Sequence, residues 1–187
     1  MTILIIIIAV VAIYIFKSGI TFKKTDPGVI INGVEWATCN LSGNGFFTRE
    51  PEHKGKLIEG ADVSNDYCPR GWRLPQVKEF TALFDEDKVS IEKAQLNGTT
   101  GMRFVDKDTG CSMFLPAAGN RGAGSIKRGG YYWCSDFVDL GNDRLVGRYV
   151  NKFIVFGKEY NPNSIEVSYY TKFGIFAKQS IRAVRET

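Results

Sequence analysis

The longest hydrophobic stretch lies at the start of the chain. Residues 2–16 carry no charged side chain, and Lys17 follows directly. An α-helix of fifteen residues would be about 22 Å long, short of the ~30 Å hydrocarbon core of a bilayer. Extension of the helix to Phe22 closes that gap, with the Lys17 ammonium reaching back toward the headgroups.

This stretch lacks two marks of a cleaved leader. No Lys or Arg precedes it, and residues 14–16 form a poor cleavage site. We expect residues 1–22 to be a membrane anchor or signal segment, and favour an uncleaved anchor that contacts the membrane through residues 2–22. A connector over 23–27 should join it to one domain over 28–187.

Two elements are well marked by their hydrophobic pattern. Apolar residues alternate over 29–31 and 34–37 on either side of Asn32-Gly33, which predicts a β-hairpin. Pro75 suits the first turn of a helix, and Val77, Phe80 and Leu83 or Phe84 then follow at helical spacing. Trp72 comes just before this helix, so its indole is expected to pack under the first turn in one core with the other two tryptophans, Trp36 and Trp133.

The middle of the chain gives weaker signals. A second short helix is predicted over 88–95, ended by Asn97-Gly98. Residues 102–105 and 111–115 are predicted strands joined by the turn Asp-Lys-Asp-Thr-Gly. The polar, irregular residues 42–67 and the glycine-rich residues 119–130 are predicted loops.

The C-terminal part is rich in β-forming residues. From Tyr131 onward, aromatic and β-branched residues dominate four successive stretches. Asn161-Pro162-Asn163 interrupts them and is predicted to be a turn. This third of the chain is therefore expected to form strands.

Composition indicates a globular domain with a mixed surface. Of 187 residues, 44% are hydrophobic and 13% aromatic, and the net charge is only +4. A nucleic-acid-binding protein usually has a denser basic stripe, so we expect no nucleic-acid partner.

Candidate catalytic and metal-binding groups are sparse. The four cysteines have no Cys-x-x-Cys spacing, and His53 is the only histidine. Three disulfide pairings stay open. Cys111 and Cys134 lie in apolar runs and are predicted to be small buried side chains. Asp106 and Asp108 resemble the start of a calcium loop, but Ala117 stands where the bidentate glutamate belongs. We expect no metal, no cofactor and no catalytic residue.

Five sequence blocks occur in an order that resembles one known family. They are VIINGVEWATCNL, CPRGWRLPQVKEF, FLPAAGNR, GGYYWCS and SIRAVRE. Together they look like the Fibrobacter succinogenes major paralogous domain, which is common in Bacteroidetes surface proteins. The similarity covers about residues 28 to 186. Gln76 in place of threonine and Cys134 in place of serine depart from the family pattern, as does Cys39.

The resemblance implies a fold. The family resembles the formylglycine-generating-enzyme branch of the C-type lectin fold, so the expectation is an α+β, C-type-lectin-like fold. That fold has two helices and a small twisted, mostly antiparallel sheet, here preceded by an N-terminal hydrophobic helix. The residues expected in its structural core are Trp36, Trp72, Pro75, Phe80, Leu115, Trp133 and Arg182.

The resemblance also implies a variable recognition surface near the C-terminus. Tyrosine and asparagine suit such a surface, because they combine contact area with adaptable hydrogen bonds. The candidate ligand-binding residues are Asn142, Asp143, Tyr149, Asn151, Tyr160, Asn161, Asn163, Tyr169 and Tyr170.

The oxidase activity within this fold branch is not expected. It resembles copper-thiolate chemistry on two cysteines about five residues apart, but only Cys134 is present and Asp139 stands at the second position. We expect a membrane-anchored, non-catalytic adhesion domain that binds a glycan or protein. The resemblance favours a domain outside the cytoplasm, whereas Lys17, Lys23 and Lys24 after the hydrophobic run favour a cytoplasmic one under the positive-inside rule. A structural subunit of a pilus-like surface assembly is the alternative.

Overall fold

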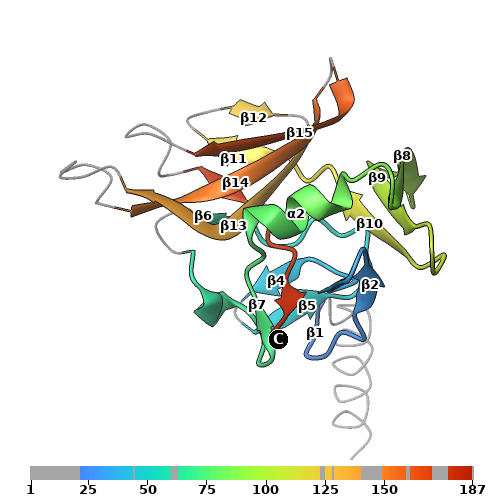
Figure 1. Ribbon diagram of the computed structural model, residues 1–187. Helices are drawn as coiled ribbons and strands as arrows, with labels where there is room; N and C mark the ends of the chain where they lie inside the picture. Colours follow the sequence, from blue (N-terminus) through green and yellow to red (C-terminus); the bar gives the residue numbers. More distant parts are fainter. Residues whose placement is uncertain are drawn as a thin grey trace, which may run out of the picture.

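The computed structural model describes residues 22–43, 45–59, 63–122, 125–127, 129–139, 149–158, 161–169 and 177–186. Within these ranges the chain is mostly β-structure, arranged as five small sheets around one short helix (Figure 1). That helix, α2, spans Val77–Leu83, and a 3-10 turn, η2, spans Asn65–Tyr67. None of the helices described is long and apolar enough to cross a membrane.

The five sheets are built from short antiparallel pairs. In order across each sheet, the first contains β1 (Phe22–Lys23), β5 (Phe46–Thr48) and β4 (Leu41–Gly43), and the second contains β2 (Val29–Ile31), β3 (Val34–Trp36), β17 (Val184–Arg185) and β7 (Trp72–Arg73). The third contains β12 (Ser125–Lys127), β11 (Asn120–Gly122), β16 (Lys178–Gln179) and β6 (Ile58–Glu59), and the fourth contains β10 (Ser112–Pro116), β9 (Thr99–Asp106) and β8 (Val89–Leu96). The fifth contains β13 (Gly130–Asp139), β14 (Tyr149–Lys158) and β15 (Asn161–Tyr169).

The expected α+β, C-type-lectin-like fold with two helices is wrong. The predicted second helix over 88–95 is strand β8, paired along its whole length with β9. Asn97 and Gly98 have φ of 45° and 80°, and two adjacent residues in this region close a tight β-hairpin. The hairpin over 29–36 and the helix after Pro75 are confirmed, and so are the strands after Tyr131 as far as the described residues extend.

The expected N-terminal hydrophobic helix is not supported. Residues 1–21 lie outside the described residues, and Phe22 belongs to β1, where it pairs with Thr48. The predicted connector also begins inside the folded body, since Lys23 pairs with Phe47 and Asp26 is buried. A helix through residue 22 is incompatible with this strand pairing.

Three predicted loops or turns contain strands instead. The stretch 42–67 includes β5 and β6, and the glycine-rich stretch 119–130 includes the hairpin of β11 and β12. Asn161, Pro162 and Asn163 open β15 rather than forming a turn. Pro162 is compatible with this place because β15 is an edge strand with an irregular register there.

The core consists of two hydrophobic clusters. Trp36 lies in the first, where its ring is 4.9 Å from that of Phe80 on α2. Trp72 and Trp133 lie in the second, and Trp72 packs edge-on against Phe47 at 5.4 Å. The predicted single core of three indoles beneath the helix is therefore wrong, because β7 carries Trp72 to the other cluster. Leu115 lies in the first cluster, and Pro75 and Arg182 are also buried.

Buried Asp26 should make the stability of this body depend on acidity. Burial alone would raise the pKa of its carboxyl group. The Thr38 and Gly28 amides, the Thr38 hydroxyl and the Lys23 ammonium outweigh that effect and hold the pKa below its usual value. The stabilisation is therefore fully present above the unfolded-state pKa of about 3.9 and is lost as pH falls through the lower folded-state value.

We accordingly expect Asp26→Asn to lower the free energy of unfolding at neutral pH. The gap between variant and wild type should narrow as pH falls below about 4, because protonation removes the same charge from the wild type. Urea denaturation over a pH series measures both. Asp87→Asn, at an exposed site, is the control. A gap that stays constant with pH would contradict the assigned role.

Candidate functional site

The start of α2 is fastened to strand β13 by charged and polar contacts. Asp136 Oδ2 accepts a hydrogen bond from the Val77 amide at 2.6 Å. Ser135 donates to the Pro75 carbonyl from its amide at 2.8 Å and from its hydroxyl at 3.3 Å. The free amides of a first helical turn favour a carboxylate. This clasp joins residues about 60 positions apart in the chain.

A second carboxylate closes the same turn. Glu79 Oε2 accepts from the Gln76 amide at 2.6 Å, and Arg73 holds both Glu79 oxygens at 2.6 and 2.9 Å. Burial works to raise the pKa of Glu79, but the bonds from Arg73 and Gln76 outweigh it and leave that pKa below its usual value. The Gln76 and Val77 amides are thus both bound by the protein's own carboxylates, and the Val77 contact fixes β13.

The clasp coincides with a bulge in β13. Trp133 pairs with Phe153 and Phe137 pairs with Asn151, so residues 134–136 face a single residue of β14. Such a bulge re-aims the strand beyond it. Trp133 before the bulge is buried, whereas Phe137 after it is 57% exposed. The clasp therefore holds a large aromatic side chain at the surface.

The strand register places the predicted ligand-binding residues on different faces of the β13–β14–β15 sheet. Tyr149 pairs with Asp139 and Asn151 with Phe137, so alternation assigns these positions to the same face of the sheet as Phe137. Tyr169 pairs with Lys152 and belongs to the opposite face. Asn161 pairs with Lys158, and Asn163 lies two residues further along β15. Asn142, Asp143, Tyr160 and Tyr170 lie outside the described residues.

Phe137 itself was not predicted. The residues from Tyr131 onward were expected to form strands, and nothing in that pattern distinguishes Phe137 from its aromatic neighbours. The only local sign of the bulge is the pair Ser135-Asp136, two polar residues whose side chains bond backbone groups readily. Their partners on α2 could not be read from the local sequence.

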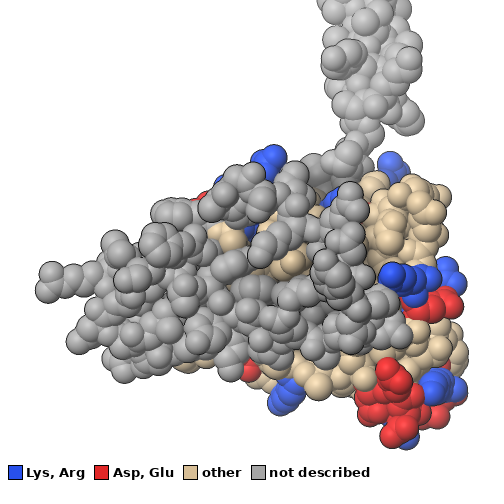
Figure 2. Space-filling view, turned by 90° about the horizontal axis from the view of Figure 1, so that it is seen from above, with Lys and Arg blue, Asp and Glu red and all other residues tan. Residues whose placement is uncertain are grey.

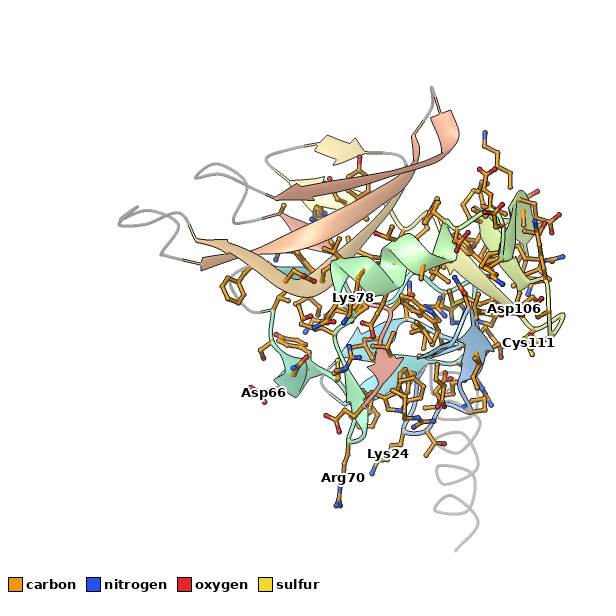
Figure 3. The ribbon with its side chains drawn as sticks, in the orientation of Figure 1. Lys24, Asp66, Arg70, Lys78, Asp106 and Cys111 are labelled. Atoms are coloured by element: carbon orange, nitrogen blue, oxygen red, sulfur yellow. The ribbon has the colours of Figure 1, made fainter. Side chains whose placement is uncertain are left out.

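Thiol and metal chemistry find little support in the part of the chain that the structure describes. None of the four cysteines forms a disulfide, and Cys39 and Cys134 are buried. Burial, with the Glu186 carboxylate nearby, raises the pKa of Cys68 to about 12, which keeps this thiol protonated and unreactive. Cys111 is exposed at the end of the β9–β10 hairpin (Figure 3), so its predicted burial is wrong: it precedes β10 and lies outside the sheet's buried face.

The Asp106 turn binds its own backbone. Asp106 accepts from the amides of Asn32 and Thr109 at 2.8 Å each and from that of Asp108 at 3.1 Å. No group of three or more His, Cys, Asp or Glu side chains among the described residues could hold a metal ion. The carboxylate stabilises the turn and the neighbouring β2–β3 hairpin.

Charged side chains of both signs are interspersed on the described atoms of the face drawn in Figure 2. On these atoms the basic side chains form no continuous stripe of the kind that follows a nucleic-acid backbone.

No known protein family, curated protein or solved structure matches this chain.

Proposed function

We propose that this chain is a non-catalytic binding protein that recognises a glycan or protein ligand through the face of the β13–β14–β15 sheet that carries Phe137. The uncharged run at residues 2–16 would anchor it in the cell envelope, with the binding face outside the cytoplasm. The resemblance to a family of bacterial surface domains motivates the class of function.

One observation carries the proposal: a phenylalanine that is 57% exposed directly after the bulge that Ser135 and Asp136 hydrogen-bond to the start of α2. Exposing a large aromatic ring to water is unfavourable, and aromatic residues are enriched where proteins bind partners. The clasp between β13 and α2 fixes the strand that carries the ring, so little entropy is lost on binding. Positions 149 and 151 add tyrosine and asparagine beside it.

The sheet is also well placed to meet a partner. In Figure 1, α2 lies between this sheet on one side and the sheets with β2, β5 and β7 on the other. Strand β13, at one edge of the sheet, carries core residues on both faces before the bulge, and its exposed aromatic ring, Phe137, comes after the bulge. The binding face is therefore the part of the β13–β14 pair beyond the bulge, where Phe137 pairs with Asn151 and Asp139 pairs with Tyr149.

We expect Phe137→Ala to weaken binding about tenfold or more, because a central aromatic contact often dominates an interface. The full-length chain in detergent would first be screened on glycan and protein arrays, and the affinity of the best ligand then measured for each variant. Tyr149→Ala and Asn151→Ala should weaken binding less, and Tyr169→Ala, at a position on the opposite face, should leave it unchanged.

Ile30→Ala is the matched control, since Ile30 is 53% exposed on β2, in another sheet. Melting temperatures of all variants should remain close to that of the wild type. Undiminished binding by Phe137→Ala, or an equal loss from Ile30→Ala, would refute the proposed surface.

A further inference from the structure

A separate hollow lies beside the β8–β9–β10 sheet, built entirely from described side chains. It has a volume of about 220 Å³ and is lined by Thr38, Pro51, Leu96, Arg103, Ser112, Met113 and Phe114. This is smaller than the usual site for a drug-sized molecule, so it suits a small ligand or a single side chain. It lies in a different sheet from Phe137 and is independent of the surface proposed above.

The sheet supplies one wall. Arg103 lies opposite Glu92 on β8 and opposite Phe114 on β10, so these three residues form a row across one face of the sheet. Ser112 lies two residues before Phe114 on the same strand. Phe114 is 6% exposed. The wall combines an aromatic ring, a hydroxyl group and a guanidinium group.

The facing wall is a loop held in place from several sides. Glu52, next to Pro51, accepts a hydrogen bond from Asn97 Nδ2 at 2.7 Å, which ties the loop to the tip of the β8–β9 hairpin. The Lys54 carbonyl accepts bonds from Asn40 at 3.0 Å and Ser180 at 2.9 Å. A wall fixed in this way is preformed, so a ligand need not order it.

The lining of the hollow carries one charged side chain, and that charge is positive. Arg103 is the only charged lining residue. Its contact with Glu92 is a single pair at 3.3 Å between side chains 45% and 55% exposed, and pairs of this kind are weak. Glu52 is engaged by Asn97, and its carboxylate lies outside the lining. A carboxylate in the hollow can therefore compete with Glu92 for the guanidinium, which binds carboxylates in two parallel hydrogen bonds.

We propose that this hollow binds small carboxylates with an apolar body. The apolar part would lie against Phe114, Leu96 and Pro51. The carboxylate would bind Arg103, with the Ser112 hydroxyl as a further donor, since the Thr38 hydroxyl already donates to Asp26. The site should distinguish a carboxylate from an uncharged amide of the same shape. The amide cannot displace Glu92 from the Arg103 guanidinium, so it cannot form the two parallel hydrogen bonds.

The probe is 3-phenylpropionate, titrated into the full-length chain in detergent up to about 10 mM. A ligand of this size is expected to bind with a dissociation constant on the order of 1 mM. The readout is the change in NMR signals of the lining residues. The wild type should bind 3-phenylpropionamide at least about tenfold more weakly.

Two charge variants sharpen the test. Arg103→Gln should abolish the preference for the acid over the amide. Glu92→Gln should tighten binding of the acid about threefold, because it removes the competing carboxylate from the guanidinium. Both side chains are about half exposed, so the fold should tolerate either change.

A steric pair completes the design. Ser112→Phe should block the hollow, whereas Ser90→Phe adds the same bulk at an exposed position of β8 outside the lining and should bind normally. Equal binding of acid and amide by the wild type, no signal change at the lining residues, or unaltered binding by Ser112→Phe would each overturn the proposal.

Discussion

Replacement of Arg182 by methionine should lower the free energy of unfolding by about 3 kcal/mol or more. The guanidinium is fully buried and donates to Asn40 Oδ1 at 2.8 Å and to the carbonyls of Ala37 and Phe114 at 3.0 Å each. Without it, three acceptors lose their donor in a region closed to water, at roughly 1 kcal/mol or more apiece.

Removal of the buried positive charge, by contrast, should favour the folded state. Burial of Arg182 lowers its pKa, which reflects the cost of keeping a cation away from water. The loss of the acceptors should still dominate, because the network extends further. Asn40 also donates to Tyr132 Oη at 3.1 Å, and that hydroxyl donates to the Pro116 carbonyl at 2.8 Å. A methionine cannot replace any of these bonds, so the whole network is disturbed.

Arg185→Met is the matched control. Arg185 is about one-third exposed, bonds Glu35 at 2.9 Å and lies over the Trp72 ring at 3.9 Å. Its partners can regain water, so the loss should be about 1 kcal/mol. Denaturant titrations followed by circular dichroism would compare the two. A difference between the variants smaller than about 1 kcal/mol would mean that the buried network contributes little.

The sequence predicted local elements better than their partners. The hairpin around Asn32-Gly33 and the helix after Pro75 follow from short-range chemistry and were confirmed. The predicted helix over 88–95 failed although Asn97-Gly98 repeats the hairpin signal at Asn32-Gly33. The turn was interpreted as the end of a helix, although Val89 and Ile91 alternate with polar residues as in a strand.

Contacts between residues far apart in the chain could not be predicted from local sequence patterns. Arg182 was expected in the core, but its acceptors are 68 to 145 positions away in the chain. The same holds for Asp136, whose partner Val77 lies 59 positions earlier. This contact accompanies the bulge that exposes Phe137, so the most accessible part of the candidate surface depends on a pairing that no local pattern encodes.

Gly101→Ala should be the second large effect, a loss of about 2 to 3 kcal/mol. Gly101 lies in β9 opposite Pro116, and an added Cβ would collide with the Leu115 carbonyl oxygen and lie 2.5 Å from Cζ of Phe114. The carbonyl belongs to a paired neighbouring strand and cannot rotate away. Relief therefore requires β10 itself to shift, and overpacking of this kind is costly in a close-packed interior.

Gly43→Ala is the control for the methyl group itself. Gly43 also lies in a strand, β4, but among the described residues, its chain neighbours apart, no atom would lie within 4 Å of an added Cβ. That change should be neutral or stabilising by about 0.5 to 1 kcal/mol, because alanine loses less backbone entropy on folding. The difference between the two variants in urea titrations isolates the close approach of β9 and β10. If Gly101→Ala proves as stable as Gly43→Ala, the two strands are farther apart than described. The Gly101→Ala change should also disturb the hydrogen bonds of Arg182. Phe114 supplies both the ring next to Gly101 and a carbonyl that accepts from Arg182.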